Sequence, residues 1–171
     1  MKRYEIYAAL ALVAVTPAPS HAAAGHVHGA AALQISVDGE RLTLDFASPL
    51  DNLLGFERAP RTDKEKEAVR RMRERLQKPE LLFVPTPEAR CARDSVKIAS
   101  PALDGGKPDR DGHAALSAEI VFRCERPQQL SSLEVKLFEA FAGVKSLDVQ
   151  VAGAKKQTGA RVTARNPRVS W

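Results

Sequence analysis

Two histidines one residue apart are the clearest sign of chemistry in this sequence. His26 and His28 lie within residues 25–29, between two glycines. In an extended segment alternate side chains point to the same face, so the two imidazoles would project together from Cα atoms about 6.5–7 Å apart. Neutral imidazole is the commonest metal ligand, and zinc accepts it in a shell of four ligands. The pair therefore indicates either half of a metal site or two solvent-facing histidines near a chain terminus.

The residues before the histidine pair have the pattern of an export signal. Lys2 and Arg3 precede an apolar run over residues 6–15, and residues 16–24 are rich in proline and small side chains. This is the pattern of a secretory signal peptide, and the apolar run is too short for a bilayer, which takes about 20 residues. We therefore expect cleavage after Ala22 or Ala24. Removal of a signal peptide over residues 1–22 would leave a soluble, exported single domain over residues 23–171.

Alternating apolar residues predict a mainly β domain. The alternation over residues 30–46 predicts a β-hairpin with Asp38 and Gly39 as its two-residue turn. Residues 50–57 lead into a loop that contains proline. Thr62 and Glu65 form a capping box for one helix that should end near Lys78, before Pro79. The charges of this helix favour a solvated face with i,i+4 ion pairs over an anion-binding patch. Further strands are predicted over residues 91–98, 113–124, 133–137, 147–151 and 160–164.

The predicted fold class is α+β, and mainly β: an antiparallel sheet or sandwich of about seven strands with one principal helix and one disulfide. Cys91 and Cys124 are the only cysteines. An even count in an exported chain predicts that they pair, which would stabilise the fold by about 3.5–4 kcal/mol in the chain-entropy relation. A reactive thiol and half of a zinc site are the alternatives, and neither cysteine has the CxxC neighbour that would support them.

Charge and composition give no support for nucleic-acid binding or catalysis. The chain has 26 Lys and Arg against 21 Asp and Glu, a net charge of +5, with the two signs interleaved. Only two Tyr and one Trp are available to stack on bases. No nucleophile and base occur in a pattern typical of an enzyme. We therefore expect a binding protein that is not an enzyme, does not bind nucleic acid and is not embedded in a membrane.

Several motifs occur together in one order along the chain. They are HVHG at residues 26–29, SPLDNLLGFERAPRTDKEK at 48–66, LLFVP at 81–85, the cysteine pair, HAALSAEIVFRC at 113–124 and LEVKLFEAFAGVKSLDVQV at 133–151. In this order they resemble the ZrgA-like family of periplasmic zinc-regulated proteins. The resemblance covers essentially the whole mature chain.

This resemblance implies a periplasmic protein that traps zinc and supports its uptake, with the zinc ion and a component of a zinc uptake transporter as partners. The implied zinc site contains His26 and His28, with His113 as the third ligand. Glu57 is the fourth candidate, because it matches the Glu of the family's Gly-Phe-Glu-His motif. Two alternatives remain open: His113 as a surface residue at a strand end, and Glu57 as the ion-pair partner of Arg58 or Arg61.

The chain departs from the family pattern at two places. The family often has a histidine where this chain has Arg58, and arginine stays protonated and cannot bind a metal. Family members also carry a long insertion rich in His, Asp and Glu between the cysteines, whereas this chain has no histidine between Ser100 and His113. We therefore expect one compact zinc site in place of a multi-ion store. The alternative is a structural or interaction module of the cell envelope that binds no metal.

Overall fold

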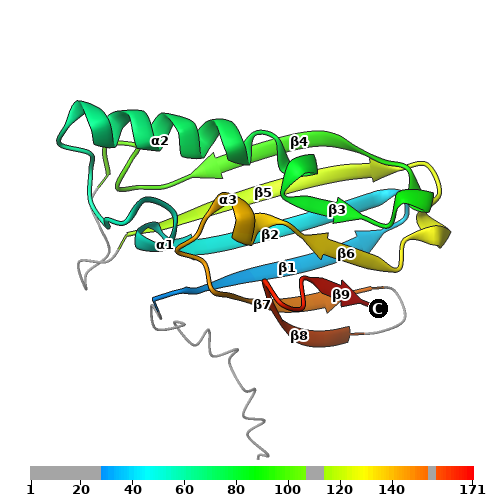
Figure 1. The fold of residues 1–171 in the computed structure, drawn as a ribbon. Helices are drawn as coiled ribbons and strands as arrows, with labels where there is room; N and C mark the ends of the chain where they lie inside the picture. Colours follow the sequence, from blue (N-terminus) through cyan, green and yellow to red (C-terminus); the bar gives the residue numbers. More distant parts are fainter. Residues whose placement is uncertain (1–27, 107–113, 154–156) are drawn as a thin grey trace, which may run out of the picture.

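The computed structural model describes residues 28–106, 114–153 and 157–171, which form nine strands in two sheets and one long helix (Figure 1). The large sheet has the order β4-β5-β2-β1-β7-β8, and the small sheet the order β3-β6-β9. The strands are β1 (Ala30–Asp38), β2 (Arg41–Pro49), β3 (Phe83–Pro85), β4 (Cys91–Ala99), β5 (Ala115–Cys124), β6 (Ser132–Val135), β7 (Ser146–Ala152), β8 (Gln157–Thr163) and β9 (Arg168–Ser170). The predicted mainly β class is confirmed.

The principal helix is α2 (Asp63–Leu76), and its capping box is present as predicted. The Thr62 hydroxyl accepts from the Glu65 amide, and the Glu65 carboxylate accepts from the Thr62 amide. The helix ends two residues before the expected Lys78, because the residue that precedes a proline is disfavoured in the helical conformation. The other helical segments are α1 (Leu50–Leu54), α3 (Leu137–Ala140) and the 3₁₀ turns η1 (Pro79–Leu81), η2 (Pro87–Ala89) and η3 (Pro127–Gln129).

The hairpin of β1 and β2 is confirmed, but its turn lies one residue later than predicted. Asp38 pairs with Arg41, so the two-residue turn is Gly39 and Glu40. Gly39 has φ +54°, a conformation that suits glycine because it lacks a Cβ. No helix is predicted between the hairpin and α2, whereas the structure has α1 there, whose five residues are too few to show a helical period.

Two further details of the sheets differ from the predictions. β1 and β7 pair in parallel, so the large sheet is mixed although its other pairs are antiparallel. Leu137, predicted at the end of a strand, begins α3 instead. The small sheet uses β3 and β9, which have three residues each and are too short to show an alternation.

The core lies between the two sheets. Phe46 from β2 and Phe83 from β3 are buried, and their ring centroids are 6.1 Å apart, which joins the sheets as a sandwich. Cys91 and Cys124 form the predicted disulfide and are directly paired across β4 and β5. The bond rules out the alternatives in which either cysteine is a reactive thiol or a zinc ligand.

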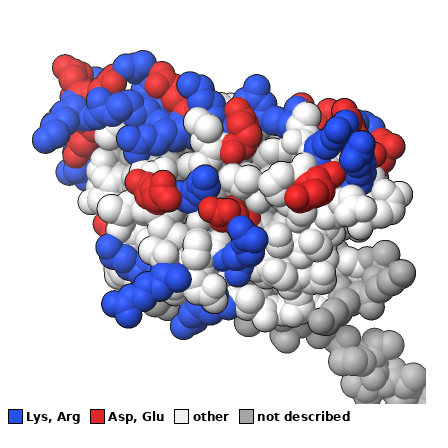
Figure 2. Space-filling model, turned by 45° about the vertical axis from the view of Figure 1, so that its right-hand side comes forward, with Lys and Arg blue, Asp and Glu red and all other residues white. Residues whose placement is uncertain are grey.

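The outer face of α2 is covered by interleaved charges (Figure 2). Arg70 contacts Glu67 at 2.6 Å and Glu74 at 2.8 Å, and Arg71 contacts Glu67 at 3.1 Å. These pairs confirm the prediction of a solvated face with ion pairs spaced three and four residues apart. Across the described ranges, no helix is long and apolar enough to cross a membrane.

Candidate metal centre

Of the two paired histidines, the structure describes His28, and this side chain contacts a carboxylate. Its Nδ1 lies 3.0 Å from Oδ2 of Asp51 in α1, and the two side chains are 69% and 38% exposed. His28 and Gly29 form a turn in which Gly29 has φ +84°, so the segment is not extended up to β1 as expected. His26 lies outside the described residues. The imidazole of His28 is thus accessible to solvent and held from one side.

Asn52, the neighbour of Asp51, anchors the backbone on which His28 sits. Asn52 is buried, with only 4% of its surface exposed. The carbonyl Oδ1 accepts from the Gly29 amide at 2.7 Å, and Nδ2 donates to the Ala30 carbonyl at 2.8 Å and to the Ser48 hydroxyl at 3.3 Å. One buried amide therefore joins α1 to the first residues of β1.

The same region is supported from β7 and from the loop before it. The Gly29 carbonyl accepts from the amides of Lys145 and Ser146, at 2.7 and 3.0 Å. A Cβ at Gly143 would lie 2.3 Å from the carbonyl oxygen of Asn52, so the loop and α1 are in direct backbone contact. The turn that carries His28 is therefore fixed by hydrogen bonds on one side and by packing of α1 on the other.

The sheet topology brings a second predicted ligand region to the same end of the molecule. β2 is antiparallel to both β1 and β5, so the first residues of β1 and β5 lie at the same end of the large sheet (Figure 1). The Leu50 amide of α1 donates to the Ala114 carbonyl at 2.8 Å. Ala114 is the chain neighbour of His113, and His113 itself lies outside the described residues.

Glu57 follows α1, and its Oε1 is buried. Arg58, one of the two ion-pair partners suggested for Glu57, binds Glu65 in the structure. Within residues 28–106, 114–153 and 157–171, no three His, Cys, Asp or Glu side chains cluster closely enough to hold a metal ion. The described ranges include only two of the four predicted ligands, His28 and Glu57.

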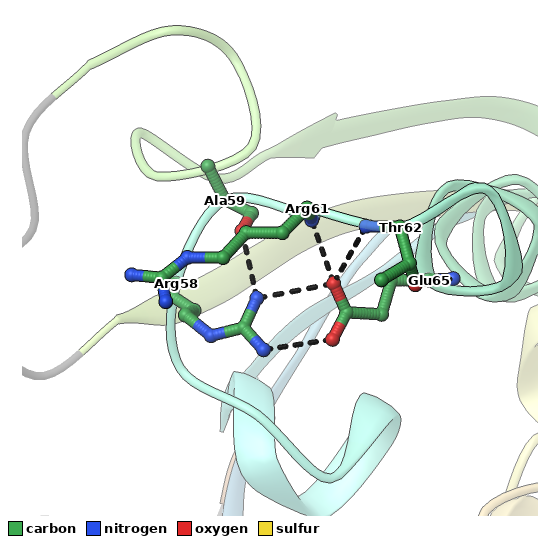
Figure 3. A network of polar contacts seen from close by, with 5 residues as sticks. All are labelled: Arg58, Ala59, Arg61, Thr62 and Glu65. Atoms are coloured by element: carbon green, nitrogen blue, oxygen red, sulfur yellow. Dashed lines mark hydrogen bonds and ion pairs between the residues drawn. The ribbon is translucent and has the colours of Figure 1, made fainter.

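Arg58 closes a network at the start of α2 (Figure 3). Its guanidinium donates to both carboxylate oxygens of Glu65, at 2.7 and 3.1 Å, and the same carboxylate accepts from the amides of Arg61 and Thr62. These hydrogen bonds, that of Arg58 first, lower the pKa of Glu65 to about 2. Arg58 also lies over the ring of Phe56, 5.2 Å from its centroid. The side chain at position 58 therefore holds the helix-capping carboxylate of Glu65.

Sequence reasoning missed Asp51 and Asn52. Both occur in the motif SPLDNLLGFE, and no local pattern relates Asp51 to His28, or Asn52 to Gly29, each 23 residues earlier. A proline followed by Leu-Asp-Asn could have suggested a short helix start, because proline and acidic residues favour the first turn. That signal would still not have identified His28 as the contact.

The family model described as "ZrgA family zinc uptake protein" matches residues 25–171. This range contains every strand and helix that the structure describes. A search of curated proteins finds no match to the chain.

Proposed function

Because this chain belongs to the ZrgA family of zinc uptake proteins, we propose that it is an exported periplasmic protein that binds one zinc ion and supports zinc uptake. The family is associated with transport and not with catalysis, and we propose no enzymatic activity for this member. Residues 1–22 would be the cleaved signal peptide, and a component of a zinc uptake transporter would receive the ion.

The proposed ligands are His26 and His28, with His113 as the third and Glu57 as the weaker fourth. The observation that carries this proposal is the common location of the starts of β1 and β5 at one end of the large sheet. β1 and β5 are separated only by β2, so their backbones are about 10 Å apart. Two histidines can share one ion across such a gap, because each Zn–N bond adds about 2 Å to the reach of the side chain.

The region around His28 also has the chemistry that zinc requires. Its imidazole is exposed, the next residue, Gly29, is hydrogen-bonded through both its amide and its carbonyl, and a carboxylate lies at Nδ1 of His28. Zinc accepts an imidazole nitrogen as a ligand, and a fixed backbone lowers the conformational entropy that is lost on binding.

Zinc titration by calorimetry on the chelator-stripped mature protein tests the proposal. We expect about one ion per chain, and we expect binding to disappear in the double variant His26→Ala/His28→Ala. The control is Gln34→Ala/Ser36→Ala, which alters two exposed positions of β1 and should bind zinc normally. Circular dichroism would show that each variant is folded. No binding by the wild-type protein at micromolar zinc would contradict the proposal.

A second candidate function is a module of the cell envelope that binds no metal. The ion pair of Arg58 with Glu65 favours it, because Arg58 stands where the family often has a histidine and here binds the carboxylate of the helix-capping Glu65. This candidate predicts a folded protein whose thermal unfolding does not respond to zinc. Calorimetry and a melting curve with and without zinc distinguish the two functions.

A further inference from the structure

The contact between His28 and Asp51 has a consequence for the metal site beyond holding the ring. We propose that Asp51 positions His28 for zinc by keeping its proton on Nδ1, so that Nε2 is the atom that binds the metal. This inference rests on the proposed zinc function. It makes Asp51 a positioning residue that acts through His28, and not a ligand.

The direction of the hydrogen bond follows from the two groups. An ionised carboxylate has only acceptor sites, so at 3.0 Å from Oδ2 of Asp51 the Nδ1 of His28 has to donate. In the neutral imidazole one nitrogen donates and the other keeps a lone pair, so Nε2 is left as the acceptor. A metal needs that lone pair. Histidines that bind metals almost always donate their other ring N–H to a carboxylate, a carbonyl or water, as His28 does here.

The partners are brought together by the backbone and not by chance contact of two surface side chains. Asn52, next to Asp51, binds the amide of Gly29 and the carbonyl of Ala30, the two residues after His28. Asp51 is thus fixed relative to His28 by two hydrogen bonds from a buried side chain. The first residue of α1, Leu50, is bonded in turn to Ala114, beside the predicted third ligand.

The carboxylate of Asp51 has no lysine or arginine partner within the described part of the chain. Among the described side chains, its only ion-pair contact is His28, whereas Asp63, Asp104 and Asp148 are each paired with a lysine or an arginine. The carboxylate of Asp51 therefore acts on the imidazole, where it fixes the tautomer and the orientation of the ring. Loss of such an outer-shell partner typically weakens metal binding by about 10–100-fold.

The first experiment measures the tautomer of His28 without metal. In long-range proton–nitrogen NMR spectra near pH 8, where an ordinary imidazole is neutral, the wild-type protein should show Nδ1 as the protonated nitrogen. A His28→Gln variant assigns the signals. Asp51→Ala should give a mixture of tautomers. Asp51→Asn should largely keep the wild-type tautomer, because its amide oxygen can still accept from Nδ1.

The second experiment measures zinc affinity by calorimetry on the same proteins. We expect Asp51→Ala to raise the zinc Kd by about 10–100-fold. The Kd of Asp51→Asn should lie between those of Asp51→Ala and the wild type, since this variant keeps the hydrogen bond but loses the charge. Asp63→Ala is the matched control: it also removes a carboxylate from the first turn of a helix, but far from His28 in the sequence and paired with Lys66. It should leave the Kd unchanged.

The outcomes separate this inference from the proposed function. A wild-type protein with its proton on Nε2 would overturn the role of Asp51, as would an Asp51→Ala variant that binds zinc as tightly as the wild type. Neither result would contradict zinc binding itself. If the wild-type protein binds no zinc, the proposed function is overturned and the role of Asp51 with it.

Discussion

Arg58 and Glu65 face each other at the start of α2, with two guanidinium nitrogens on two carboxylate oxygens at 2.7 and 3.1 Å (Figure 3). Such a bidentate pair has a defined geometry that lysine could not reproduce. The same carboxylate accepts from two backbone amides, so Glu65 satisfies amides at the helix start that have no partner within the helix.

This arrangement predicts an acid-sensitive contribution to stability. The folded-state pKa of Glu65 is lowered from 4.5 to about 2. A lowered pKa means that the stabilisation is fully present above pH 4.5 and is lost as the pH falls toward 2. The free energy of unfolding of the wild type should therefore exceed that of Glu65→Gln at neutral pH, and the difference should shrink in acid. Urea unfolding of both proteins across this range measures it, with Glu88→Gln, an exposed acid, as the control.

The disulfide should stabilise the fold mainly by restricting the unfolded chain. Cys91 and Cys124 are 33 residues apart, and the chain-entropy relation gives about 3.5–4 kcal/mol for a loop of that size. Cys91→Ser/Cys124→Ser should lose about this amount in urea unfolding, and reductant should have no further effect on the variant. A loss below about 1 kcal/mol would show that the reduced chain is already restricted.

Sequence reasoning predicted the elements whose burial has a strong period. Leu33 and Ile35 in β1, and Leu42 and Leu44 in β2, alternate with more exposed neighbours, and the strands follow because every second side chain enters the core. The parallel pairing of β1 with β7 was not predictable in this way. Alternation shows which face of a strand is buried, and it carries no information about the neighbour at the edge of that strand.

The candidate site was predictable only in part for a related reason. His28 could be identified from its residue type and its spacing from His26. Its partner Asp51 depends on how α1 packs against the start of β1, and this packing depends on the buried amide of Asn52 and the missing side chain of Gly143. Such contacts between distant segments have no local signature. Position 58 is similar, since only the structure shows that Arg58 binds Glu65.

Asn52 should contribute both to stability and to zinc binding. Asn52→Ala removes three hydrogen bonds and leaves the Gly29 amide and the Ala30 carbonyl without their side-chain partner in a part-buried region. Unsatisfied groups of this kind cost about 1–3 kcal/mol. We expect a loss of that size in urea unfolding, together with a weaker zinc Kd. Asn166→Ala, at an exposed asparagine, is the control and should change neither quantity. Wild-type stability in Asn52→Ala would contradict the anchoring role.

Gly143 tests whether the position of α1 controls the metal site. A Cβ at this residue would lie 2.3 Å from the Asn52 carbonyl oxygen, so Gly143→Ala has to displace α1 or the loop before β7. Overpacking of this kind costs about 1–3 kcal/mol. Because Asp51 moves with α1, the zinc Kd should rise as well, and the NMR tautomer of His28 should become mixed. Gly159→Ala, whose Cβ would be no closer than 3.5 Å to any atom, should behave as the wild type. A destabilised Gly143→Ala that kept the wild-type Kd and tautomer would show that the contact between Asp51 and His28 survives movement of α1.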